Sequence, residues 1–97
     1  WERLSVGCSV NQCPRQHGAL TQMWMTPPEL VSWLSYQFTL NRGDVISLGT
    51  PSGVGPIESG DELITTLYVD DAPCITLTNP VAARGAFDSE SVSQREV

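Results

Sequence analysis

The sequence is poor in positive charge. It has five Lys and Arg residues against eleven Asp and Glu, which gives a net charge of −6. Proteins that bind nucleic acids neutralise phosphates with clustered basic side chains, and the chain has no such cluster. The same lack of basic residues disfavours an anionic membrane surface. We therefore expect neither a nucleic acid nor a membrane as a partner.

Long apolar runs and leader sequences are also missing. No apolar run approaches the roughly 20 residues of a membrane-spanning helix. No charged segment followed by an apolar one marks a signal peptide. We expect a cytoplasmic protein, or a mitochondrial one if a targeting peptide lies before Trp1. Because the chain opens at Trp1 and not at Met, we expect it to be a piece of a longer protein.

Cysteine is present in an odd number, which is a poor basis for a disulfide framework. Free thiols in a reducing compartment are the simplest interpretation, and we expect them to be buried or half-buried. Cys8, Cys13 and the single histidine, His17, could in principle bind zinc. No second pair of ligands follows them, so a zinc site is not expected.

One helix is strongly indicated, over about residues 27–38. Thr26 is a candidate N-cap, a proline occupies the first helical position, and Glu29 completes a capping-box pattern. Apolar residues then recur at helical spacing. We expect a short amphipathic helix whose Trp33 and Phe38 pack in the core.

The remaining patterns favour strands. Alternation over residues 3–10 and 63–69 is typical of β-strands, and residues 70–73 read as a hairpin turn into a return strand at 74–79. Residues 45–48 read as a short buried strand. The polar segment 84–97 lacks periodicity and is expected to be a flexible tail. With 40% hydrophobic residues, the chain has enough apolar content for a core. These elements predict an α+β fold that is mainly β.

The segment 49-GTPSGVGP-56, called the glycine loop below, fits none of the common glycine motifs. It has no Lys and no following helix, which a phosphate-binding P-loop or a dinucleotide fingerprint requires. Proline stands where a nucleophile elbow places its serine. The loop is either a rigid connector or a place where the backbone closely approaches a ligand. Thr50 could then direct its hydroxyl at an oxygen of that ligand.

The run 40-LNRGDVISLGTPSGVGP-56 closely resembles the C-terminal signature of the fumarylacetoacetate hydrolase family. That signature is a Gly-Asp turn, a short strand and Gly-Thr-Pro-x-Gly-Val-Gly. Other segments are similar to family landmarks as well: the hairpin 10-VNQCPRQ-16, Met23, Gly60-Asp61 and 79-NPV-81. The resemblance implies that residues 1–83 are the C-terminal portion of such a domain, part of a mixed β-roll.

The resemblance also implies a function. Family members are usually dimeric enzymes, some of them in aromatic catabolism, that bind Mg²⁺ or Ca²⁺. They act on oxo-acids through an enolate, by hydrolysis, decarboxylation or tautomerisation. Their metal carboxylates and acid–base residues lie upstream of the matched region, so we expect neither catalytic nor metal-binding residues in this chain. The substrate-binding residues that the resemblance assigns to the glycine loop are Gly49, Thr50, Pro51 and Gly53.

The chain departs from the family pattern at several positions. Gln12 replaces a hairpin glycine, Ala19-Leu20 replaces Asn-Thr, Arg42 replaces proline, and 70-DDAP-73 replaces a turn that contains glycine. Whether the chain alone is an enzyme stays open. It could need an N-terminal half or a second copy for activity, or be a catalytically inactive truncated member. An unrelated small β-rich binding module is the remaining alternative.

Overall fold

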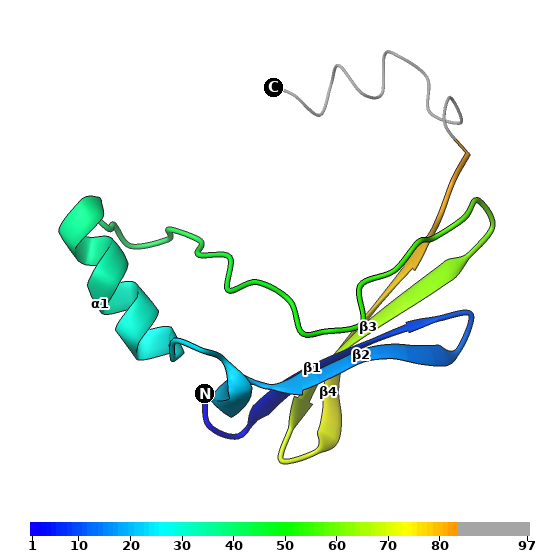
Figure 1. Cartoon of the computed structure of the whole chain (residues 1–97), viewed down its shortest axis with the longest axis horizontal. Coiled ribbons are helices and arrows are strands. Elements are labelled where there is room, and N and C mark those ends of the chain that lie inside the picture. The colour runs from blue at the N-terminus through cyan, green and yellow to red at the C-terminus, as the bar shows by residue number, and fades with distance from the viewer. Residues whose placement is uncertain (84–97) are drawn as a thin grey trace.

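The computed structural model describes residues 1–83, and the predicted tail at 84–97 lies outside them. A four-stranded antiparallel sheet forms the body of the molecule, with strand order β2-β1-β3-β4 (Figure 1). The strands are β1 (Leu4–Val10), β2 (Cys13–Ala19), β3 (Glu62–Val69) and β4 (Ala72–Pro80). A short 3₁₀ turn, η1 (Leu20–Gln22), and one helix, α1 (Pro27–Gln37), lie between β2 and β3. The predicted fold, α+β and mainly β, is confirmed.

The two hairpins of the sheet have the same turn type and the same bulge after the turn. Each turns through two residues with positive φ, namely 11–12 between β1 and β2 and 70–71 between β3 and β4. Positive φ at both positions defines a type I′ turn, which matches the twist of the strands that it joins. In each hairpin a proline follows close behind, and the register then shifts by one residue. The extra residue is Arg15 in β2 and Cys74 in β4, which makes each a β-bulge.

Helix α1 begins where the sequence predicts. The backbone N–H of Glu29 donates to the Thr26 hydroxyl at 3.3 Å, and prolines fill the first two helical positions. The helix does not lie on the sheet but stands apart from it (Figure 1). Trp33 and Phe38 are 52% and 65% exposed, so the expectation that they pack in the core is wrong. No residue of α1 is buried.

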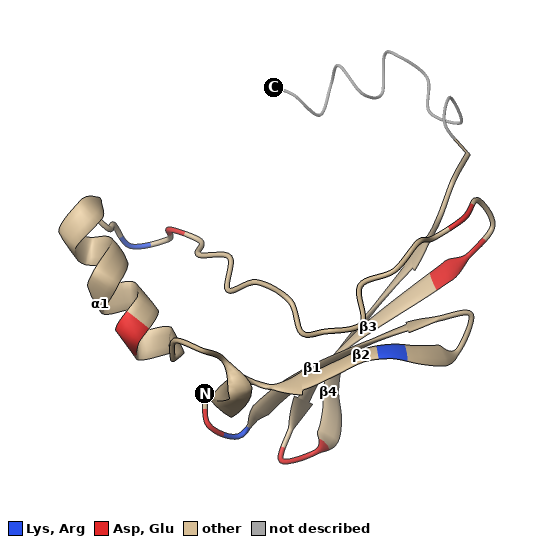
Figure 2. Ribbon diagram, in the orientation of Figure 1, with Lys and Arg blue, Asp and Glu red and all other residues tan. Residues whose placement is uncertain are grey.

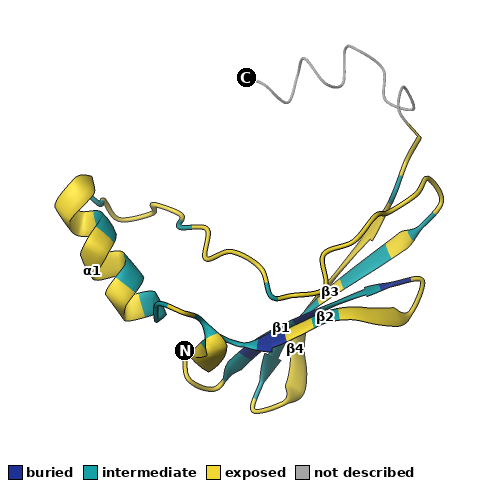
Figure 3. Ribbon diagram, viewed as in Figure 1, coloured by how far each residue is buried: buried dark blue, intermediate teal, exposed yellow. Residues whose placement is uncertain are grey.

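Few residues of the described chain are buried, although 40% of the sequence is hydrophobic. The buried residues in the described part are Ser5, Gly7, Val10 and Gly18, and most of α1 and the loops is exposed (Figure 3). The expectation of a sizeable core is therefore wrong for residues 1–83. Cys8 is half-buried as predicted, but Cys13 and Cys74 are exposed, contrary to expectation, because both lie on edge strands.

Residues 45–48 do not form the predicted strand. They run extended but make no strand pairing within the described part of the chain, and Val45 is 94% exposed. A β-strand is stable only beside a second strand that satisfies its backbone groups. The strands of the sheet lie away from this segment, and none of them pairs with it (Figure 1). Among residues 1–83, no helix has the length and apolar content needed to cross a bilayer.

Candidate substrate loop and groove

The glycine loop is held against the edge strand β2. The anchor is the β-bulge, where Arg15 has no partner on β1 and Gln16 follows it. Bulges redirect the side chains of a strand, and β2 has a free edge on which the loop can lie. The Arg15 guanidinium donates to the Pro56 carbonyl at 3.2 Å, and this bond anchors the C-terminal end of the loop to β2.

Gln16 anchors the N-terminal end of the glycine loop. Its Nε2 donates to the Thr50 hydroxyl oxygen at 2.8 Å and to the Pro51 carbonyl oxygen at 2.7 Å. One half-buried amide therefore holds two consecutive residues of the loop. These contacts join segments more than thirty positions apart in the sequence.

Two glycines let the loop and the strand come together. A Cβ placed on Gly53 would lie 2.0 Å from the Arg15 carbonyl oxygen, a distance that no side chain tolerates. Gly53 also has φ +106°, a conformation that glycine adopts without strain. On the strand, a Cβ on Gly18 would lie 2.9 Å from the ring of Pro51. The space at Gly53 is thus filled by β2 itself, so this glycine has a packing role beside any role in substrate binding.

The docked loop forms one wall of an open groove of about 1040 Å³. Strands β1 and β2, η1, the linker residues 23–25 and α1 supply the rest of the wall. The groove is lined by Val6, His17, Gly18, Ala19, Leu20, Gln22, Met23, Trp24, Met25, Leu30, Trp33, Leu48, Gly49, Thr50, Pro51 and Ser52. None of these side chains is acidic, and none is Lys or Arg. The groove therefore offers apolar surface with a few hydrogen-bonding groups, the usual composition of a small-molecule site.

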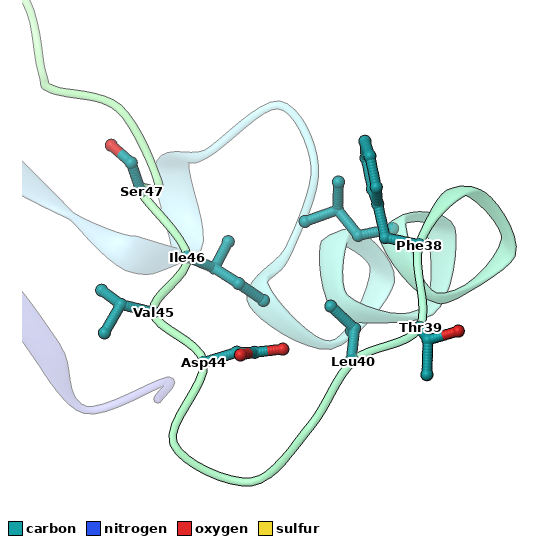
Figure 4. Close-up of a pocket in the computed structure, with 8 residues that line it drawn as sticks. Phe38, Thr39, Leu40, Asp44, Val45, Ile46 and Ser47 are labelled. Carbon is teal, nitrogen blue, oxygen red and sulfur yellow. The ribbon is translucent and has the colours of Figure 1, made fainter.

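A second, smaller cavity of about 460 Å³ lies at the C-terminal end of α1 (Figure 4). Phe38, Leu40 and Ile46 turn apolar side chains toward it. Its only charged residue, Asp44, accepts a hydrogen bond from the backbone N–H of Asn41 at 2.7 Å. Asp44 therefore stabilises its own turn, and the larger groove with Thr50 is the better candidate site.

Most acidic residues lie at turns and strand ends, and Glu29 lies in the first turn of α1 (Figure 2). Asp61 accepts hydrogen bonds from the Glu58 backbone N–H at 2.8 Å and from the Asn11 amide at 2.9 Å. These donors lower the pKa of its carboxyl. At the other end of the sheet, Arg3 donates to Asp70, and this hydrogen bond lowers the pKa of Asp70. Both carboxylates stabilise turns and lie outside the groove.

Among residues 1–83, no group of three or more His, Cys, Asp or Glu side chains lies close enough together to bind a metal ion. Cys8, Cys13 and His17 in particular do not converge, because Cys8 pairs with Gln16 and Cys13 with Val10 in the ladder. The described residues thus do not provide the oxygen ligands that Mg²⁺ or Ca²⁺ requires.

Residues 1–82 match the model of the C-terminal domain of fumarylacetoacetate hydrolase. The chain belongs to the fumarylacetoacetate hydrolase family. Its hairpin, helix and glycine loop are the segments on which the sequence resemblance rests, and that prediction is confirmed.

Relatives within the family include enzymes. The chain is 43% identical over 65 residues to oxaloacetate tautomerase YcgM of Escherichia coli, a match that covers 67% of this chain and 30% of the relative. It is 39% identical over 61 residues to the human mitochondrial oxaloacetate tautomerase FAHD1, covering 63% of this chain and 28% of the relative. The chain thus spans less than a third of the length of these proteins.

Solved structures of related proteins support the same family assignment. A putative fumarylacetoacetate isomerase/hydrolase from Oleispira antarctica superposes with a TM-score of 0.79 at 34% identity, covering 84% of this chain and 36% of that one. The 5-carboxymethyl-2-hydroxymuconate delta-isomerase from Mycobacterium smegmatis superposes with a TM-score of 0.72 at 40% identity, with coverages of 84% and 31%. The fold of residues 1–83 is therefore that of a portion of the family's domain.

All four predicted site residues lie in the docked loop, but they face different surroundings. Gly49, Thr50 and Pro51 line the groove, whereas Gly53 lies against β2. Sequence reasoning missed Gln16, which contacts two of them. Its signal was present in the Arg-Gln pair after the hairpin turn, but no local pattern links that pair to a loop so distant in the sequence.

Proposed function

We propose that this chain contributes the substrate loop of an enzyme that acts on an oxo-acid through an enolate, with tautomerisation of a dicarboxylic oxo-acid as the reaction. The observation that carries the proposal is the position of Thr50, held at the wall of a neutral groove by Gln16. The oxaloacetate tautomerases among its relatives support the choice of reaction.

The geometry supports a binding role for the chain. The Thr50 hydroxyl can donate to a carbonyl or enolate oxygen, while the neighbouring apolar surface excludes water from the substrate carbon skeleton. The family resemblance implies a divalent cation, and its ligands would have to come from polypeptide outside this chain. Because residues 1–83 do not fit such an ion, no step is assigned through it.

A partner polypeptide is part of the proposal. Large apolar side chains lie exposed around the groove, including Trp24 at 96% and Trp33 at 52%. Surface of this kind is normally covered in a finished protein. We propose that an upstream part of the same protein, or a second copy of it, covers this surface and supplies the acid–base residues. A catalytically inactive truncated protein is the alternative, and it predicts no turnover.

The test is a tautomerisation assay on the protein expressed with all the polypeptide that its gene encodes. Oxaloacetate enol should be converted to the keto form, measured as loss of enol absorbance. An assay for pyruvate would reveal decarboxylation instead, and an assay for oxalate and acetate would reveal hydrolysis of the C–C bond. Thr50→Val should lower kcat/KM by about 10- to 100-fold, the usual cost of a hydrogen bond to a charged group.

Thr50→Ser keeps the hydroxyl and should retain most of the activity. Thr78→Val makes the same chemical change on β4, at an exposed position outside the groove, and should leave kcat/KM unchanged. Equal kinetics for Thr50→Val and the unmodified enzyme would remove Thr50 from the substrate site. No turnover of any oxo-acid would favour the inactive alternative.

A further inference from the structure

We propose that Gln16 is a positioning residue, which fixes the Thr50 hydroxyl as a hydrogen-bond donor toward the groove. The inference rests on the proposed function and deepens it, because it states the polarity of the group that the substrate must present. A hydroxyl can donate or accept, so its role in a site depends on what its other neighbours impose on it.

The orientation of the Gln16 amide is set by Pro51. The Pro51 carbonyl oxygen can only accept a hydrogen bond, and the Gln16 atom 2.7 Å away must therefore be the nitrogen. The same nitrogen lies 2.8 Å from the Thr50 hydroxyl oxygen. An amide nitrogen has no free lone pair to accept with, so it donates to Thr50 as well. Its two protons are thereby assigned to the two loop oxygens.

The direction of the Thr50 proton follows. Because its oxygen accepts from Gln16, the hydroxyl proton points away from that amide. Thr50 is exposed and lines the groove, so a ligand there can receive this proton. The matching group on a ligand is an acceptor such as a carbonyl, carboxylate or enolate oxygen. A ligand that offers only a donor at this point, such as an ammonium group, can use the second lone pair of the hydroxyl oxygen but leaves the hydroxyl proton without an acceptor, so it is the poorer match.

The surroundings of Gln16 hold it in place. A Cβ on Gly53 would lie 3.2 Å from the Gln16 Cγ, which places the stem of the side chain against the loop backbone. The residue follows the bulge of β2, and its side chain is half-buried. Pre-organised donors of this kind need no rearrangement as negative charge develops on the substrate oxygen.

The test is a double-mutant cycle in the full gene product, measured as kcat/KM for oxaloacetate enol. Gln16→Glu keeps the shape but can only accept at neutral pH, which turns the Thr50 proton toward residue 16. We expect it to lower kcat/KM by about 10- to 100-fold. Gln16→Met removes the amide without reversing the hydroxyl and should cost less. Gln22→Glu adds the same charge to the same groove and should also cost less.

The cycle separates positioning from simple support of the loop. In a Thr50→Val background there is no hydroxyl left to orient, so Gln16→Glu should cost clearly less than in the unmodified enzyme, and the remaining cost should come from the lost bond to Pro51. An equal cost in both backgrounds would overturn the proposal and leave Gln16 as a structural anchor.

A measurement without turnover keeps this inference separate from the proposed function. In NMR spectra of the unmodified protein, both Gln16 side-chain amide protons should exchange slowly with solvent. In Thr50→Val one of the two should lose its protection. If neither changes, Gln16 does not donate to Thr50 and the inference fails. If this result holds while no oxo-acid is turned over, only the proposed function fails.

Discussion

Replacing Gly53 by alanine tests whether the docking of the glycine loop creates the site. Gly53 and Gly49 both have positive φ, +106° and +91°, so alanine at either position is strained by about 1–2 kcal/mol. The two positions differ in space. A Cβ on Gly49 meets nothing within 4 Å, whereas one on Gly53 would lie 2.0 Å from the Arg15 carbonyl oxygen. Gly49→Ala is therefore a matched control for backbone strain.

The additional cost at Gly53 can be bounded from the contacts that hold the loop. The clash is with backbone, so it is relieved only when the loop leaves β2. That movement breaks the bonds from Gln16 to Thr50 and Pro51 and from Arg15 to Pro56. Each is worth about 0.5–1.5 kcal/mol. We expect Gly53→Ala to cost about 2–4 kcal/mol more than Gly49→Ala, since the loss cannot exceed the free energy of docking.

The measurement is the free energy of unfolding in urea for both variants of the full gene product, with hydrogen exchange of the loop amides as a local readout. In Gly53→Ala the amides of the glycine loop should exchange faster while those of β1 and β3 keep their protection. The turnover rate of Gly53→Ala should also fall, because undocking of the loop moves Thr50 out of the groove. Equal losses of stability in the two variants would refute the close approach of loop and strand.

Two further predictions concern the turns. Gln12 is the second of the two central residues of a type I′ turn, with φ +66°, where glycine is preferred. Gln12→Gly should therefore raise the free energy of unfolding in urea by about 0.5–1 kcal/mol. A lower free energy of unfolding would contradict this turn geometry. Hydrogen bonds from Glu58 and Asn11 lower the pKa of Asp61 below its ordinary 3.8. The stability that this provides is complete above about pH 4 and is lost as pH falls through the lower pKa of the folded state. Asp61→Asn should therefore reduce the loss of unfolding free energy on acidification. An unchanged pH dependence would show that other groups cause this loss.

Local chemistry was sufficient to predict the helix and the β3–β4 hairpin, whereas the β1–β2 hairpin was indicated by the family resemblance. Thr26 and the prolines after it mark the start of α1, because capping depends only on residues within one turn. The β3–β4 hairpin follows from alternation around a two-residue turn. The family resemblance likewise identified the loop that contains Thr50, because its signature is continuous in the sequence.

Features that depend on distant segments could not be predicted in this way. Residues 45–48 have the composition of a strand but lack a neighbouring strand within the described chain, so composition alone is misleading there. Trp33 follows helical spacing, yet its exposure is set by what packs on the helix. The contact of Gln16 with Thr50 joins strand β2 to a loop of unrelated pattern, and only the docking of that loop on the strand edge brings them together.

The order of strands also has a consequence for how the protein folds. Each hairpin closes through a two-residue turn, but β1 and β3 meet across the whole segment 20–61, and Arg3 reaches Asp70 over 67 positions. Closing a loop of that length costs on the order of 4 kcal/mol in chain entropy, so joining the hairpins is expected to be the slow step. Helix α1 and the glycine loop lie within that segment. Because the glycine loop docks on β2, docking shortens the free segment that must close when the two hairpins meet, and this couples formation of the groove to the joining of the sheet.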